Sequence, residues 1–166
     1  MRVFGTLAAL CIATLSCAPT AQNRASPAAG PTVDRDAERS VVVTVERLFE
    51  AMRTRDTATA RQLLGPELVL VSIRSEGTRA HRSQTVADFL RAIAGSPEEL
   101  RERMWSPEVR LDGPVATLWA PYDFHIGARF SHCGHDAIQL IQTGGRWIIT
   151  GLTYTVSTAS CTAPPG

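Results

Sequence analysis

Three long runs of strand-forming residues near the C-terminus constrain the fold more than any other feature of the chain. They cover residues 115–126, 130–143 and 147–156 and are rich in β-branched and aromatic side chains. Gly127-Ala128 and Gly144-Gly145 separate the runs, and tight hairpin turns favour glycine because it tolerates positive φ angles. The pattern predicts an antiparallel meander in the C-terminal half of the folded part.

Helical patterns precede these strands. Residues 36–56 carry an apolar stripe at three- and four-residue spacing, formed by Val41, Val45, Leu48, Phe49 and Met52. Boundary residues and periodicity predict shorter helices at 57–64, 83–94 and 97–104, and short strands at 68–73 and 108–111. Helices followed by strands predict an α+β fold, in which the helices pack on one face of a curved sheet.

The N-terminal segment has the features of an export signal. Residues 1–16 contain one arginine and then a short apolar run, VFGTLAALCIATLS, that is well short of a membrane span. The segment that ends at Cys17 (TLSC) resembles the lipobox of bacterial lipoproteins, in which the cysteine carries lipid and becomes the mature N-terminus. Ordinary cleavage near Ala18 or Ala21 and an uncleaved short anchor are the alternatives. We therefore expect export to the cell envelope, either lipid-anchored through Cys17 or free in the periplasm or the medium.

The rest of the chain divides into three parts. Residues 18–35 are tether-like and expected to be disordered, residues 36–158 form one domain of ordinary size, and residues 159–166 are a C-terminal tail. The formal net charge is +1 and no basic stripe is present, so nucleic acid is not expected as a partner. Contact with a membrane is expected only through the N-terminal lipid.

Two of the four cysteines belong to the folded part and the tail. Cys11 lies in the signal and Cys17 carries lipid or lies in the tether, which leaves Cys133 and Cys161. An even pair in an oxidising compartment predicts a disulfide that holds the C-terminal tail on the sheet. The alternative is two free thiols.

The order of elements, together with two segments, resembles the nuclear transport factor 2-like superfamily, which includes SnoaL-like and ketosteroid isomerase-like proteins. The segments are VERLFEAMRTRDTATARQLLGPELVLV and FSHCGHDAIQLIQTGGRWIITGLTYTV. Phe49 and residues 53–56 match the end of the family's first helix, and residues 145–148 match its final glycine turn and Trp-Ile pair. The resemblance implies a cone-shaped, curved antiparallel sheet with the helices on its concave face, a deep pocket, and frequent dimers through the open sheet face. It implies no single activity, because the superfamily contains isomerases, dehydratases, cyclases and binding subunits.

Strand periodicity sorts the C-terminal side chains by face. With two-residue turns, Asp123 lies opposite His132, while Trp119 and Thr153 both lie opposite Asp136. We therefore expect a polar cluster in the pocket that consists of Asp123, His132, Asp136 and Thr153, with Trp119 as an aromatic wall. The residues expected on the opposite face are Tyr122, Cys133, His135 and Tyr154. A register slip of one residue would exchange the two faces.

Asp123, His132 and Asp136 are the candidate catalytic residues. An aspartate that orients a histidine is typical of acid–base sites, because the imidazole titrates near neutral pH. The resemblance adds that Asp136, in an apolar cone, could have a raised pKa and act as acid or base. The alternative is a structural pair in which Asp123 and His132 satisfy each other at the sheet edge.

No metal or cofactor is expected. His132 and His135 point to opposite faces of one strand and converge on a metal ion only if a bulge intervenes. The alternative metal set consists of His125, His132 and Asp123. The sequence contains no phosphate loop, nucleophile elbow or kinase motif.

Five residues are candidates for the ligand pocket: Trp119, Thr153, Arg74, His81 and Trp105. The alternative for Arg74 and His81 is a solvated position in a loop. Together these features favour a small-ligand-binding domain with no assigned reaction. The alternatives are an isomerase, dehydratase or cyclase that uses the Asp–His residues for proton transfer, and an interaction module that uses the open sheet face. The expected partners are an unidentified small molecule and, through that face, a second copy of the chain.

Overall fold

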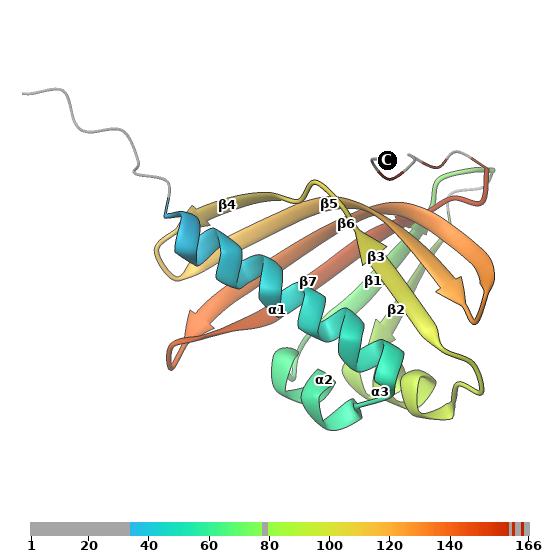
Figure 1. Cartoon of the computed structure of the whole chain (residues 1–166), viewed down its shortest axis with the longest axis horizontal. Coiled ribbons are helices and arrows are strands. Elements are labelled where there is room, and N and C mark those ends of the chain that lie inside the picture. The colour runs from blue at the N-terminus through green and yellow to red at the C-terminus, as the bar shows by residue number, and fades with distance from the viewer. Residues whose placement is uncertain (1–33, 78–79, 160, 162–163, 165–166) are drawn as a thin grey trace, which may run out of the picture. The chain divides into compact units, whose positions relative to one another are not determined.

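The structure, a computed structural model, describes residues 34–77, 80–159, 161 and 164 (Figure 1). The predicted export signal, Cys17 and nearly all of the predicted tether lie outside these residues. The described part contains helices α1 (Arg35–Thr54), α2 (Thr57–Leu63) and α3 (Val86–Gly95). Its strands are β1 (Val69–Arg74), β2 (His81–Thr85), β3 (Leu100–Met104), β4 (Glu108–Asp112), β5 (Val115–Ile126), β6 (Arg129–Thr143) and β7 (Arg146–Val156).

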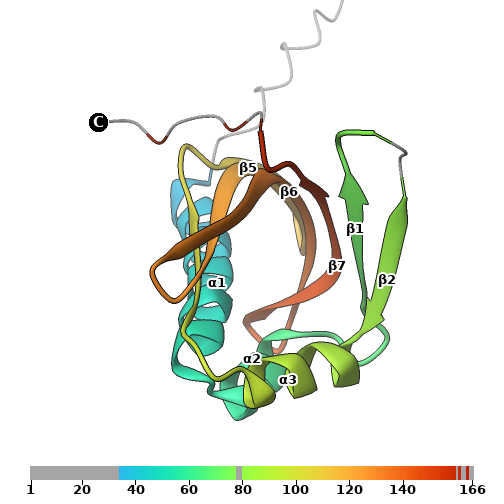
Figure 2. The same ribbon diagram turned by 90° about the vertical axis from the view of Figure 1, so that its right-hand side faces the viewer.

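The strands form one curved sheet in the order β2-β1-β7-β6-β5-β3, and β4 pairs with a further stretch of β5. The three helices pack against this sheet, and Figure 2 shows α2 and α3 side by side at one end of it. The expected α+β class and the meander β5-β6-β7 are confirmed. One pair, β1 with β7, is parallel, which differs from the wholly antiparallel sheet that was expected. The sheet is therefore mixed.

Helix α1 supplies the largest share of the helical core. Asp34 caps its first turn by accepting a hydrogen bond from the backbone N–H of Ala37 at 3.0 Å. The predicted apolar stripe is buried against the sheet, with Val41, Val45 and Leu48 fully inaccessible. The indole N–H of Trp147 on β7 donates to Ser40 Oγ at 2.9 Å, which attaches the helix to the final hairpin. Helix and sheet together bury enough apolar surface to hold a core with room for a cavity.

Two of the predicted helices differ in the structure. Residues 97–104 were expected to be helical, but residues 100–104 form strand β3, which pairs with β5. Side chains of the run LRERM alternate between the two faces of the strand. Pairing with β5 also gives its backbone N–H and C=O groups the hydrogen-bond partners that a single helical turn would not supply. The helix expected at 83–94 begins only at Val86, because residues 81–85 pair with β1 as β2. Thr85 ends the strand and starts α3 through a capping box with Asp88.

A β-bulge changes the register between β5 and β6. Next to the turn, His125 pairs with Phe130, as a two-residue turn requires. Ser131 is then an extra residue, so Phe124 pairs with His132 and every later pair is shifted by one. The predicted pairing of Asp123 with His132 is wrong, and Asp123 lies opposite Cys133 instead. Likewise, Trp119 does not face Asp136.

A second bulge lies between β6 and β7. Leu140 pairs with Ile149, but Gln139 pairs with Gly151, which leaves Thr150 as the extra residue. Asp136 therefore lies opposite Tyr154 and not opposite Thr153. Side chains alternate along a strand, so a shift of one residue exchanges the two faces. The first bulge exchanges the faces expected for β5 relative to β6, and the second exchanges those expected for β7. The expected faces of Tyr122, Tyr154 and Asp123 are consequently wrong.

Candidate functional site

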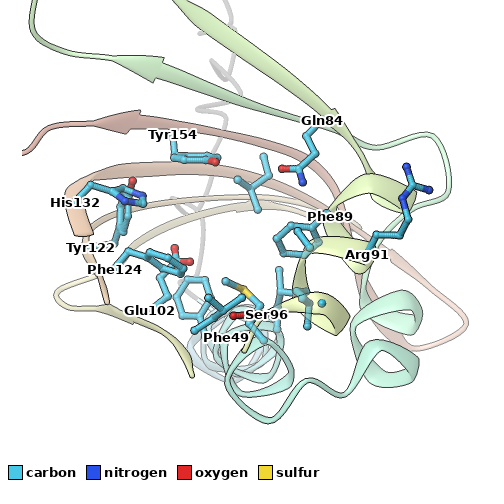
Figure 3. A pocket seen from close by; sticks show the side chains of 17 residues that line it. Phe49, Gln84, Phe89, Arg91, Ser96, Glu102, Tyr122, Phe124, His132 and Tyr154 are labelled. Carbon is cyan, nitrogen blue, oxygen red and sulfur yellow. The ribbon is translucent and has the colours of Figure 1, made fainter. Parts of the chain in front are cut away.

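A cavity of about 510 Å³ lies between the concave face of the sheet and helices α1 and α3 (Figure 3). Aromatic and aliphatic side chains dominate its lining: Leu48, Phe49, Met52, Phe89, Ala92, Ile93, Leu100, Tyr122, Phe124, Leu152 and Tyr154. The polar side chains in the lining are Gln84, Arg91, Ser96, Glu102 and His132. In Figure 3, Glu102 and His132 lie on one side of the cavity, and Gln84 and Arg91 lie on the other. The volume is in the range of a site for a small organic molecule.

Two carboxyl groups meet beside the cavity. Glu102 comes from β3 and lines the cavity, while Asp136 comes from β6 and is only 2% exposed. Their side chains lie within hydrogen-bonding contact of each other. Asp136 Oδ2 nevertheless has no hydrogen-bond donor among the described residues. Since a carboxylate can only accept hydrogen bonds, the contact between the two groups requires a proton on one of them.

The environment favours that proton. Burial is the main cause that raises the pKa of Glu102 well above its usual range, and the negative charge of Asp136 raises it further. Burial also raises the pKa of Asp136, to about 7, although the hydrogen bond with Glu102 acts in the opposite direction. The pair therefore holds at least one proton near neutral pH. Such a pair can donate one hydrogen bond and accept others.

Aromatic groups surround the carboxyl pair. The Tyr122 hydroxyl donates to the backbone carbonyl of Thr155 at 2.8 Å, and burial raises the pKa of Tyr122. Burial likewise raises the pKa of Tyr154, whose hydroxyl is hydrogen-bonded to Ser72. Burial lowers the pKa of His132, whose ring lies 5.0 Å from that of Phe124. Tyr122, Tyr154 and His132 are therefore uncharged at neutral pH.

Glu102 is also reached from a second side. A smaller cleft of about 220 Å³ lies between α1 and β3, and Glu102 and Phe49 line both this cleft and the main cavity. The other residues of this rear cleft are Glu46, Glu50, Arg53, Arg103 and Met104. Water can thus approach Glu102 without crossing the apolar cavity.

The three candidate catalytic residues are not brought together. His132 lines the cavity, and Asp136 points to the same face of β6, four residues further along. Asp123 lies between Tyr122 and Phe124, which both line the cavity, so its side chain points to the opposite face of β5. There its two carboxylate oxygens accept hydrogen bonds from the guanidinium of Arg103, one of them from Nε at 2.8 Å.

None of the five predicted ligand-pocket residues lines the cavity. Trp119 is 47% exposed on the opposite face of the sheet, where its ring stacks on that of His135 at 5.2 Å. Thr153, Arg74 and His81 are exposed on β7, β1 and β2, and Trp105 lies half-buried between β3 and β4. The prediction that His132 and His135 face opposite ways is confirmed.

Sequence reasoning missed Glu102, Tyr122 and Tyr154. Glu102 was assigned to a helix, although the alternation of LRERM would have placed it on the same face as Leu100 and Met104. The two tyrosines were placed on the wrong face because no local signal marked the bulges. The bulges follow from how the strands curve around the helices, which is a tertiary effect.

The expected disulfide is present between Cys133 and Cys161, with a Cα–Cα distance of 5.7 Å. Among the described residues, no three His, Cys, Asp or Glu side chains are grouped as metal ligands would be. No helix in the described part has the length and apolar character needed to cross a membrane.

No protein-family model and no curated protein sequence match the chain. Its structure, however, is similar to many solved structures. A nuclear transport factor 2-like (NTF2-like) protein of unknown function from Shewanella baltica has a TM-score of 0.56 at 14% identity, and the match covers 78% of this chain and 100% of that chain. The beta subunit of a candidate aromatic-ring-hydroxylating dioxygenase from Novosphingobium aromaticivorans has a TM-score of 0.64 at 14% identity, with 78% and 94% covered.

A candidate dehydratase of the NTF2-like family from Streptomyces avermitilis has a TM-score of 0.57 at 17% identity, and the match covers 77% of this chain and 100% of that chain. These likenesses establish that the chain has the NTF2-like fold, as its sequence resemblance predicted. At such identities they do not establish an activity.

Proposed function

We propose that the chain binds a small, largely apolar molecule in the main cavity, with the polar group of that molecule at the Glu102–Asp136 pair. The observation that supports this proposal is a cavity of about 510 Å³ whose lining is apolar and aromatic except for a few polar groups. Apolar walls supply affinity through burial, while a small number of polar groups orient the ligand. Asp136 is the least exposed of the buried polar side chains in the described residues, at 2%, and its partner Glu102 lines the cavity itself.

The proposal is tested by blocking the cavity. Ala92 and Ala94 both lie on α3 and are exposed, but only Ala92 lines the cavity. The neutral fluorescent probe N-phenyl-1-naphthylamine should bind the native protein saturably, with enhanced fluorescence. Ala92→Trp should weaken this binding at least about tenfold, which corresponds to roughly 1.4 kcal/mol, whereas Ala94→Trp should leave it unchanged. Absence of saturable binding, or equal behaviour of the two variants, would refute the proposal.

A second candidate function is proton-transfer catalysis of the isomerase, dehydratase or cyclase kind. The observation that favours it is the pKa of Asp136, which burial raises to about 7, in the range where a carboxyl group is useful as acid or base. Glu102, which lines the cavity, would exchange the proton with substrate while Asp136 behind it holds or supplies the proton. The candidate dehydratase from Streptomyces avermitilis shows that the fold is compatible with a proposed activity of this type.

This alternative is separable from simple binding. Once a reactive substrate is found, Asp136→Asn should lower kcat by about 100-fold or more, the usual size of an acid–base contribution, while the affinity for the naphthylamine probe stays within about twofold. If the same variant changed affinity alone, the protein would be a binder.

We further propose that the protein is exported and anchored by a lipid on Cys17. Support comes from the apolar run and lipobox-like residues before Cys17 and from a disulfide of the kind found in oxidising compartments. Expressed in full length in a bacterial host, the protein should be found in the membrane fraction, and Cys17→Ser should abolish the lipid mass and release the chain from the membrane or leave it unprocessed. A native protein without added lipid mass would contradict the anchor.

A further inference from the structure

The carboxyl pair has no positively charged partner in the part of the chain that the structure describes. The two arginines that flank Glu102, Arg101 and Arg103, point to the other face of β3, where Arg103 pairs with Asp123. Arg91, at the far side of the cavity, is exposed and pairs with Asp88, and Arg53 in the rear cleft pairs with Glu50. No arginine is among the groups that shift the pKa of Glu102 or Asp136. Whatever negative charge the pair carries is therefore not neutralised by a cationic side chain of the described residues.

Asp136 adds a second, independent observation. Its side chain is among the fully buried ones, and its Oδ2 atom has no hydrogen-bond donor among the described residues. It points to the cavity face of β6 beside Glu102, and Tyr154, its partner in the register with β7, lines the cavity. A proton shared with Glu102 satisfies one of the four carboxyl oxygens of the pair, so the others remain acceptors for donors that a bound molecule supplies.

The rest of the cavity suits a cation with an apolar body. Phe49, Phe124, Tyr122 and Tyr154 line it around the carboxyl pair. The faces of aromatic rings attract cations, and more strongly where water is excluded. An ammonium group also provides three hydrogen-bond donors, whereas a neutral hydroxyl provides one and a carboxylate would be repelled.

We infer that the molecule bound in this cavity is an amine with an apolar body, whose ammonium group lies against the Glu102–Asp136 pair. This inference rests on the proposed binding function and specifies its ligand class. When the ammonium group binds, the pair loses a proton to solvent, which reaches Glu102 through the rear cleft. Amine binding is therefore expected to release protons and to strengthen as the pH rises.

The direction of this pH dependence is set by the carboxyl pair, because the other titratable groups that line the cavity keep one charge state near neutral pH. Tyr122, Tyr154 and His132 are uncharged near neutral pH, since burial raises the pKa of both tyrosines and lowers that of the histidine. The other charged groups of the rear cleft are Glu46, Glu50, Arg53 and Arg103. Arg91 lies on α3 at the cavity, and Arg82 lies near Tyr154. The arginines keep their charge over the whole range, and Asp123 is held by Arg103. Asp136, whose pKa burial raises to about 7, is thus the group beside the cavity that loses its proton on going from pH 6 to 8.

Three ten-carbon probes with a phenyl ring and different polar groups test the inference: 4-phenylbutylamine, 4-phenyl-1-butanol and 4-phenylbutyrate. Their affinities are measured by displacement of N-phenyl-1-naphthylamine and by calorimetry. At pH 8 the amine should bind at least about tenfold more tightly than the alcohol, and the butyrate should bind most weakly. The affinity of the amine should fall at pH 6, that of the alcohol should change little, and calorimetry in phosphate and Tris should reveal proton release with the amine alone.

Glu102→Gln should reduce the preference for amine over alcohol to less than about threefold. The matched control Glu108→Gln, at an exposed position on β4, should retain the full preference. Binding of the naphthylamine by both variants verifies that they are folded. If the naphthylamine binds but the alcohol or the butyrate competes as well as the amine, the inference is wrong and the proposed cavity remains. If the naphthylamine itself does not bind, the proposed function fails and the inference with it.

Discussion

At the scale of single residues, the decisive feature is a pair of acids that the fold keeps protonated. An isolated buried carboxylate is unfavourable, so Glu102 and Asp136 bind protons more tightly in the folded chain than in the unfolded one. Their folded-state pKa values are raised, and the stability that follows is present at low pH. It is lost as the pH rises from about 4, the unfolded value, through the folded value, which for Asp136 is about 7.

We therefore expect the native protein to unfold more easily at pH 8 than at pH 5. The pair should reduce the free energy of unfolding by a few kcal/mol over this range, at about 1.4 kcal/mol for each unit of raised pKa. The double variant Glu102→Gln/Asp136→Asn should lose this dependence. Urea denaturation of both proteins at the two pH values measures the effect.

The comparison between the two proteins is needed because His132 acts in the opposite direction. Burial lowers the pKa of His132, so its contribution to stability increases as the pH rises. That contribution cancels in the difference between native protein and variant. A native protein whose stability rises from pH 5 to 8 in parallel with the double variant would contradict the shared-proton pair.

At the scale of elements, the contact between β6 and β7 depends on one glycine. A Cβ atom on Gly134 would lie 2.1 Å from the backbone carbonyl oxygen of Thr155, and that oxygen also accepts the hydrogen bond of Tyr122. Because Gly134 lacks a side chain, Thr155 can come close enough to orient Tyr122 beside the cavity. This part of the sheet therefore links strand packing directly to the geometry of the site.

Gly134→Ala should destabilise the protein by about 3 kcal/mol, at the upper end of the effect of overpacking, because backbone must move. The control Gly95→Ala, at a position where a Cβ meets nothing within 4 Å, should change stability by less than about 1 kcal/mol. Urea denaturation reports both values. Equal effects of the two substitutions would show that the β6–β7 contact adapts to the extra methyl group.

The C-terminal segment is attached to the same strand by the disulfide between Cys133 and Cys161, which are 28 residues apart. Cys161→Ser should lower the free energy of unfolding by about 3 kcal/mol, because the unfolded chain regains the entropy of an open loop. Native protein treated with a reductant should lose the same amount, and the variant should not respond to the reductant. If reductant has no effect on the native protein, the two thiols are free in solution.

At the scale of the whole molecule, the face of the sheet opposite the cavity carries exposed apolar side chains. Val115 and Ile141 pair across β5 and β6 and are 52% and 41% exposed, and Trp119 lies further along the same face of β5. Exposed apolar groups in such a row are typical of contact surfaces. They support the prediction from the sequence that two copies of the chain associate through this face.

Sedimentation measurements test the association. Trp119→Ser should shift the molecule toward the monomer at micromolar concentration, whereas Val43→Ser, at an exposed apolar position on α1, should not. A native protein that is monomeric at all concentrations would rule out the dimer. The cavity opens on the other face of the sheet, so binding of N-phenyl-1-naphthylamine should be equal in both variants.

The sequence alone determined the long helix α1, the meander β5-β6-β7, its hairpin turns and the disulfide. Each of these depends on local features, namely the apolar stripe of α1, glycines at Gly127 and Gly144, and an even pair of cysteines. Only the tertiary structure decided which carboxyl groups meet. Two extra residues, Ser131 and Thr150, shift the strands by one position as the sheet curves around its helices, and a shift of one exchanges the two faces. Asp123 consequently leaves the cavity, and Glu102, in a segment whose proline suggested a helix, takes its place beside Asp136.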